Sequence, residues 1–111
     1  MSGSSGGGGG RPGGDGLAVD CDLVEKTVLN SPVGDVLREL KRGDALRVEL
    51  HTEGKVRLLR ALTAEGKVAG SLTPRQTPAI VGCLEKGNRY VAHVLRVSGG
   101  MCEVEIRRSG D

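Results

Sequence analysis

Aromatic side chains are almost absent from this chain, which restricts how it can build a core. Its 111 residues include no Phe and no Trp, and Tyr90 is the single Tyr. The core must therefore be packed from Val, Leu, Ile and Ala, and aliphatic residues of this kind suit the half-buried surface of a sheet. We expect a mainly β fold of the α+β type.

The N-terminal residues differ in composition from the rest of the chain. Residues 1–16 contain no apolar side chain beyond Met1, so nothing in them offsets the entropy that is lost on ordering. We expect a disordered Gly/Ser-rich leader at 1–17, either natural or left by cloning, one domain at 18–108 and a tail at 109–111. No segment approaches the roughly 20 apolar residues of a membrane span, so we expect no contact with a membrane.

Alternation of apolar and polar residues predicts six strands. They lie at 22–29, at 44–51, from Val56 to Ala61, from Val68 to Leu72, at 89–97 and from Cys102 to Arg107. The Leu58–Leu59 pair shifts the alternation and predicts a β-bulge. Gly70, inside a strand, predicts a close backbone approach or a sharp bend.

A short helix is expected after the first strand. Apolar residues recur at i, i+3, i+4 and i+7 from Val33 to Leu40, which is the spacing of one helical face. Ser31 is the expected N-cap, because Pro follows it at the first helical position. With Gly43 as the stop signal, the pattern predicts a helix at 32–42.

A second helix is expected after the fourth strand. Residues 73–76 have the form of a capping box, Pro78 delays the regular helix by a turn, and Gly87 ends it. The order of elements is then β-α-β-β-β-α-β-β. Six short strands and two short helices predict a small six-stranded OB-like barrel, closed or nearly closed.

The three cysteines are expected to be unpaired. Cys21, Cys83 and Cys102 match no zinc spacing, and an odd number argues against a disulfide framework. Cys83 and Cys102 occupy apolar positions, which favours packing in the core. Unpaired thiols fit a reducing compartment, so we expect a cytoplasmic protein.

No catalytic or metal-binding pattern is present in the sequence. Neither His51 nor His93 has a Cys or carboxylate at ligand spacing, and there is no phosphate-loop motif. We therefore expect no enzyme activity, no metal and no cofactor. The alternative is a nucleophile pair formed by His93 with Cys83 or Cys102, which would require these side chains to meet in a cleft.

Positive charge is concentrated in the middle of the chain. The net charge is only +2, but the residues from Lys55 to Arg96 include eight Lys or Arg and two Glu. Such a stretch forms either a phosphate-contacting surface or an ordinary solvated one. In the first case we predict nucleic-acid contacts by five cations and the one aromatic residue that can stack on a base. These residues are Arg57, Arg60, Lys67, Arg75, Arg89 and Tyr90.

Three segments of the chain resemble the HIRAN domain. They are VLRELKRGDALRVEL at 36–50, KVAGSLTPRQ at 67–76 and GNRYVAHVL at 87–95. HIRAN domains are small OB-like barrels in which a Gly-containing strand leads into a helix that starts with Pro. They occur fused to DNA helicases and nucleases and as free-standing bacterial and phage proteins, and the better-known members bind single-stranded DNA ends. The resemblance implies a barrel fold and DNA binding.

Two departures concern the residues that grip a DNA end in this family. An Asn-Pro-x-Asp-x-x-Ala segment usually precedes the third strand, where this chain has residues 53–58. Ser71 stands where an aromatic residue usually follows the strand Gly. The resemblance therefore supports the fold more than it supports DNA-end binding.

These observations together predict a non-catalytic module that binds nucleic acid, either single- or double-stranded DNA, through a basic face. The alternative is a protein-interaction module, such as a phage or mobile-element accessory protein that dimerises or binds a protein partner. An exposed apolar patch would favour that alternative.

Overall fold

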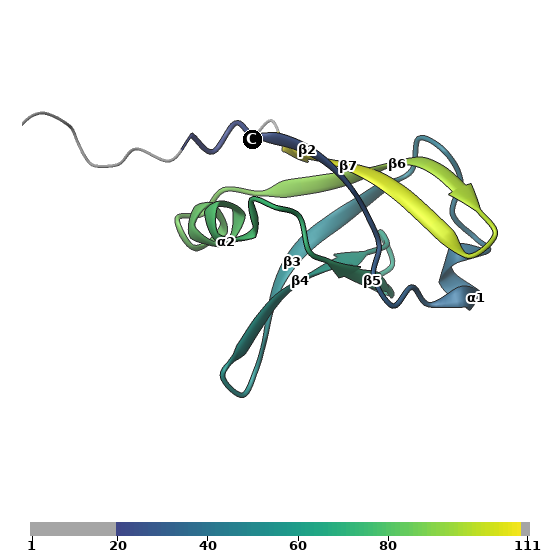
Figure 1. The fold of residues 1–111 in the computed structure, drawn as a ribbon, viewed down its shortest axis with the longest axis horizontal. Coiled ribbons are helices and arrows are strands. Elements are labelled where there is room, and N and C mark those ends of the chain that lie inside the picture. Colours follow the sequence, from purple (N-terminus) through teal and green to yellow (C-terminus); the bar gives the residue numbers. More distant parts are fainter. Residues whose placement is uncertain (1–19, 110–111) are drawn as a thin grey trace, which may run out of the picture.

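Figure 1 shows the computed structural model of the chain, which describes residues 20–109. The predicted leader at 1–17 and the last two residues of the predicted tail lie outside the described residues. The elements are β2 (Val24–Val28), α1 (Gly34–Leu37), β3 (Ala45–Glu53), β4 (Val56–Leu62), β5 (Val68–Leu72), α2 (Thr77–Glu85), β6 (Tyr90–Ser98) and β7 (Met101–Arg108). The predicted order β-α-β-β-β-α-β-β and the mainly β class are confirmed.

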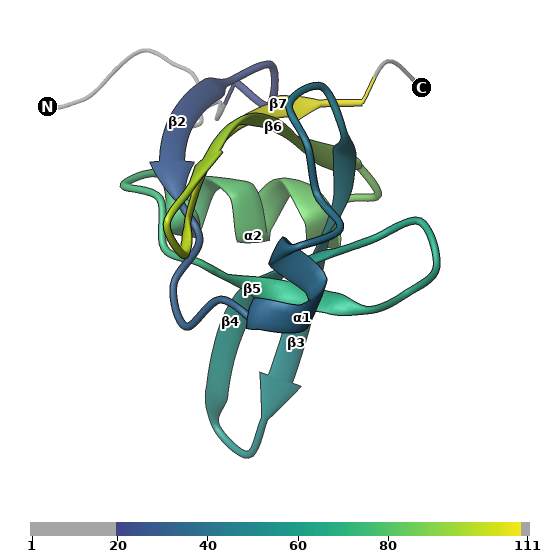
Figure 2. The same ribbon diagram turned by 90° about the vertical axis from the view of Figure 1, so that its right-hand side faces the viewer.

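The six strands form one antiparallel sheet in the order β2-β7-β6-β3-β4-β5. The sheet curls, so that its outer strands approach each other (Figure 2). Asn30, just after β2, forms an isolated bridge with Ser71 of β5, with N–H···O distances of 2.8 and 2.9 Å. Within residues 20–109 no continuous ladder joins β2 to β5, so the sheet is not closed, and the predicted barrel is not confirmed.

The core lies on the inner face of the curled sheet. Leu46 and Val48 of β3 and alternate residues of β7 are buried, as their spacing predicts. Helix α2 lies between the β6–β7 hairpin and the β4–β5 pair (Figures 1 and 2). It contributes Ile80 and Cys83 to the core. The core is thus aliphatic apart from the sulfur atoms and the ring of Tyr90.

The predicted helix at 32–42 is much shorter in the structure. Ser31 has a φ of 47° and does not cap it, and no side-chain cap is present. The N–H of Val33 donates to the carbonyl of Ala69 at 2.9 Å, so the chain is still held along β5 at this point. Helix α1 is therefore one turn, and the N–H groups of Glu39 and Leu40 donate to carbonyls only three residues back.

The predicted capping box at 73–76 is also wrong. Helix α2 begins at Thr77, one turn later than the capping box predicts, because Pro78 falls in its first turn. The delay predicted from Pro78 is therefore confirmed. The Glu25 carboxylate of β2 accepts the N–H groups of Arg75 at 2.5 Å and Gln76 at 3.1 Å. The backbone N–H groups at the start of the helix therefore find their hydrogen-bond acceptor in a residue about fifty positions away in the sequence.

The β-bulge predicted at Leu58–Leu59 lies elsewhere. The β3–β4 register runs without interruption from Arg47↔Leu62 to Glu53↔Val56, because β4 carries apolar residues on both of its faces. The irregularity lies at Ala61/Leu62, in the pairing of β4 with β5. A second register shift, which the sequence does not predict, occurs between Val94 and Arg96 in β6.

The close approach predicted at Gly70 is confirmed. A Cβ atom at this position would lie 3.1 Å from the Asn30 carbonyl oxygen, 3.1 Å from the Leu29 Cβ and 3.3 Å from the Pro32 Cα. Two of these three atoms belong to the backbone, which cannot rotate away as a side chain can. The absence of a side chain at Gly70 therefore allows Asn30 to bridge to β5.

We predict that Gly70→Ala lowers the free energy of unfolding by about 1–3 kcal/mol, because the methyl group forces the 29–32 segment away from β5. Gly82→Ala in α2 is the matched control. No atom lies within 4 Å of a Cβ there, and we expect a gain of about 0.4–1 kcal/mol. Urea denaturation followed by circular dichroism measures both changes. Equal stability of the two variants would contradict this account of Gly70.

Candidate nucleic-acid interface

The first two predicted cations lie on opposite faces of β4. Arg60 is on the outer face, where it pairs with Glu49 of β3 at 2.7 Å, opposite Ser71 of β5. Arg57 lies three residues earlier in a regular strand, so it points to the other face. There it forms an ion pair with Glu85 of α2. Both guanidinium groups are already paired with carboxylates.

Two other predicted cations lie apart from these. Lys67, between β4 and β5, lies 3.5 Å from Glu39 and 3.6 Å from Glu65. These carboxylates raise the pKa of the Lys67 amino group, Glu39 contributing most. Arg75 precedes α2 and lines a cleft beside β2 together with Lys26. The five predicted cations are therefore not gathered on one face.

The predicted stacking residue is in the core. The Tyr90 side chain is 1% exposed, and its hydroxyl donates to the Cys21 carbonyl at 2.5 Å. Burial raises the pKa of this hydroxyl, so it stays a protonated donor. The ring is closed to solvent and is not available to stack on a base in this structure.

A different group of cations surrounds Val91 on the outer face of the sheet. Val91 of β6 lies opposite Arg47 of β3 on one side and Arg107 of β7 on the other. Arg89 precedes Val91 by two residues, and the Ser109 N–H donates to its carbonyl at 2.7 Å. This bond extends the β6–β7 pairing, so Arg89 faces the same side as Val91. We call Arg47, Arg89 and Arg107 the arginine cluster.

All three side chains of the arginine cluster are exposed. Arg107 pairs with Glu105 at 2.7 Å. Among residues 20–109, no carboxylate lies within ion-pair distance of Arg47 or Arg89. The hydrogen bond from Arg107, with the nearby Lys26 and His93, lowers the pKa of Glu105. The cluster therefore carries more positive than negative charge.

The sequence contains a signal for this cluster that the charge count misses. Arg47 and Arg107 occupy outward positions of their predicted strands, but both lie outside the Lys55–Arg96 stretch. Strand alternation gives the correct face for each, while their meeting depends on the β3–β6–β7 pairing. Of the predicted site residues, only Arg89 belongs to the cluster.

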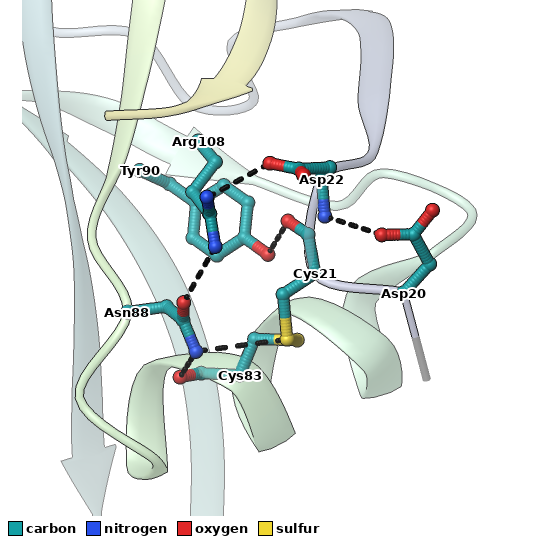
Figure 3. Close-up of polar contacts among 7 residues, drawn as sticks. All are labelled: Asp20, Cys21, Asp22, Cys83, Asn88, Tyr90 and Arg108. Carbon is teal, nitrogen blue, oxygen red and sulfur yellow. Dashed lines mark hydrogen bonds and ion pairs between the residues drawn. A yellow bond between two sulfur atoms is a disulfide. The ribbon is translucent and has the colours of Figure 1, made fainter. Parts of the chain in front are cut away.

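The cysteines are not all unpaired. Cys21 and Cys83 form a disulfide that joins the residues before β2 to α2 (Figure 3). Cys102 is free and fully buried, and burial raises the pKa of its thiol. The odd number of cysteines thus reflects one disulfide and one core residue. This removes the basis on which the sequence favours a reducing compartment.

The Cys–His nucleophile pair does not form. Cys83 is in the disulfide, and Cys102 faces the core. His93 lies between the buried Ala92 and Val94, so its side chain points to the outer face of β6. The imidazole and the free thiol therefore lie on opposite sides of the sheet.

Two further properties concern the described part of the chain. In residues 20–109, no group of three or more His, Cys, Asp or Glu side chains is placed to hold a metal ion. Neither α1 nor α2 is long and apolar enough to cross a membrane. Comparison with family models, curated proteins and solved structures gave no match to the chain.

The Glu49–Arg60 pair predicts a specific dependence of stability on pH. The hydrogen bond from Arg60 lowers the pKa of Glu49, so the unfolded chain takes up this proton first. The stabilisation is fully present above the ordinary glutamate pKa of about 4.3 and is lost as pH falls through the lower folded-state pKa. At pH 7 we expect a contribution below about 1 kcal/mol, because the pair is partly exposed.

Urea denaturation of Glu49→Gln between pH 7 and pH 3 tests this expectation. The stability difference from the wild type should be largest near pH 7 and should shrink towards pH 3. Glu53→Gln is the control, since this carboxylate at the end of β3 has no ion pair in the described part of the chain. A difference that is constant with pH would show that Glu49 does not act through its charge.

Proposed function

We propose that this protein is a non-catalytic module that binds single-stranded nucleic acid, DNA in particular, through the arginine cluster. The observation that carries the proposal is the placement of three exposed arginines around Val91, two of them without a carboxylate partner among residues 20–109. Exposed guanidinium groups form strong, charge-assisted hydrogen bonds with phosphate oxygens. A cytoplasmic location, with access to nucleic acid, forms part of this proposal.

The spacing of the cluster suits an extended backbone. Neighbouring strands lie roughly 4.8 Å apart, so Arg47 and Arg107, on either side of β6, stand roughly 10 Å apart at their backbones. Long side chains at that separation can contact different phosphates of one strand. Arg89 extends the row along β6.

The residues of this surface also determine whether base stacking or phosphate contacts supply the binding energy. Tyr90 is the only Phe, Tyr or Trp residue in the chain and is buried, so it does not stack on a base. Affinity then comes from phosphate contacts, which release counterions and carry no sequence information. We expect binding that is insensitive to sequence and falls steeply with salt.

The proposal includes a HIRAN-like barrel as the fold class. The supporting features are the Gly-containing strand β5 and the Asn30–Ser71 bridge between the outer strands. Pro74, the Pro of the resembling segment, precedes α2 by three residues and does not start it. Ser71 lies beside Arg60 on β4 and offers no ring to a terminal base. We therefore expect no preference for DNA ends over internal single-stranded sites.

Titration of labelled single- and double-stranded oligonucleotides at salt concentrations from about 50 to 200 mM tests the proposal. Three phosphate contacts on a single strand predict a slope of log K against log salt of about −2, and Arg47→Ala/Arg89→Ala should reduce it to about −0.7. We expect this double variant to lose about tenfold or more in affinity at the lowest salt.

Lys55→Ala/Lys41→Ala is the matched control for this titration. It removes the same charge from two residues that are not in the cluster, one in the β3–β4 turn and one in the loop before β3. An equal loss in both double variants would show a general charge effect instead of a site. Absence of binding at the lowest salt would overturn the proposal.

Exposed apolar side chains favour one second candidate, a protein-interaction module such as a phage or mobile-element accessory protein. Val24 and Val28 are 49% and 39% exposed on the outer strand β2. Val33, just before α1, and Met101, at the start of β7, are also exposed. If no oligonucleotide binds, self-association or a protein partner at these residues becomes the leading hypothesis.

A further inference from the structure

The disulfide network is connected to the arginine cluster through neighbouring residues. Arg89 lies between Asn88 and Tyr90 in the chain, and Arg107 precedes Arg108. Figure 3 shows that Asn88, Tyr90 and Arg108 all point towards the Cys21–Cys83 disulfide and the residues beside it. The backbone on both sides of Arg89 is therefore attached to the disulfide region.

Each attachment is a specific hydrogen bond. The Tyr90 hydroxyl donates to the Cys21 carbonyl at 2.5 Å. The Asn88 amide donates to the Cys83 carbonyl at 3.0 Å and to the Cys21 sulfur at 3.6 Å. Arg108 pairs with Asp22 at 2.9 Å and donates to the Asn88 side-chain oxygen at 3.3 Å. The disulfide is the one covalent member of this network.

The disulfide is the main attachment of the residues before β2 to the rest of the fold. The β2–β7 ladder begins at Val24, so residues 20–23 lie outside it. Within the described chain, no backbone–backbone hydrogen bond anchors these four residues to another element. Leu23 is buried, but Asp22 is exposed and Cys21 only partly buried. Without the disulfide, side-chain contacts alone hold this segment, and it opens at low cost.

We propose that the Cys21–Cys83 disulfide is a redox switch that fixes the backbone around Arg89 when oxidised and releases it when reduced. In the oxidised form, Cys21 holds the Tyr90 hydroxyl and Asn88 in place, so Arg89 is presented beside Arg47 and Arg107. In the reduced form, residues 20–23 detach and the 86–90 loop loses two of its contacts. The consequence for ligand binding rests on the proposed function.

The chemistry of the switch is thiol–disulfide exchange with a dithiol reductant. A thiolate of the reductant attacks the Cys21 sulfur, because Cys83 is only 1% exposed. The S–S bond breaks, and Cys83 leaves as a thiolate that takes up a proton. The second thiolate of the reductant then displaces Cys21, which is protonated in turn. The protein gains two electrons and two protons, and the dithiol becomes a disulfide.

Amide hydrogen exchange measured by mass spectrometry on the full chain, with and without dithiothreitol, tests the switch. We expect exchange to rise at least tenfold in residues 20–24 and 86–91 on reduction, with strands β3 and β4 unchanged. Cys21→Ala/Cys83→Ala should exchange like the reduced protein under both conditions. Cys102→Ala, which leaves the disulfide intact, should respond to dithiothreitol like the wild type.

The same samples are titrated with a labelled single-stranded oligonucleotide at low salt. We expect reduction to weaken binding by about fivefold or more, approaching the loss caused by Arg89→Ala alone, since it displaces one of three phosphate contacts. Unchanged exchange at 86–91, or an equal rise in β3 and β4, would overturn the switch. A local rise with equal affinity in both states would overturn its control of binding. A local rise with no binding in either state would support the switch and overturn the nucleic-acid function.

Discussion

The contact between the 29–32 segment and Gly70 is the constraint on which the curled sheet depends. It brings Asn30 within hydrogen-bonding distance of β5, so the two outer strands enclose one core. A core without Phe or Trp tolerates this because small side chains fill its inner layer. Ala61, Ala69 and Ala92 are all 0% exposed. Larger residues at these positions would separate the strands that the glycine brings together.

Strand alternation and strand pairing determine where charged side chains gather. Each strand points one side chain to the core and the next to the outer face, so two cations three residues apart on β4 lie on opposite faces. Cations from neighbouring strands can instead lie side by side on one face. Arg57 and Arg60 illustrate the first case, and the arginine cluster illustrates the second. A count of charge along the chain cannot distinguish these cases, because it ignores both strand parity and strand order.

Local patterns predicted the elements well, and distant contacts account for most of the differences. Alternation of apolar and polar residues was sufficient to predict where the strands lie. The close approach at Gly70 and the delayed helix at Pro78 also followed from local sequence alone. The helix starts were wrong because Glu25 and Ala69, both far away in the chain, replace local caps. The disulfide was missed for a related reason: Cys21 and Cys83 are 62 positions apart, and only the folded chain shows that they meet.

The single aromatic residue links the core to the outer surface. Tyr90 contributes its ring to packing and its hydroxyl to Cys21, so it is unavailable to a ligand and instead positions its neighbour. The residue before it must then face outward, and that residue is Arg89. Arg107 forms an ion pair with Glu105, whereas Arg89 and Arg47 have no carboxylate partner in the described chain. Arg47 is fixed within β3, so Arg89 is the member of the cluster whose position depends most on the state of the disulfide.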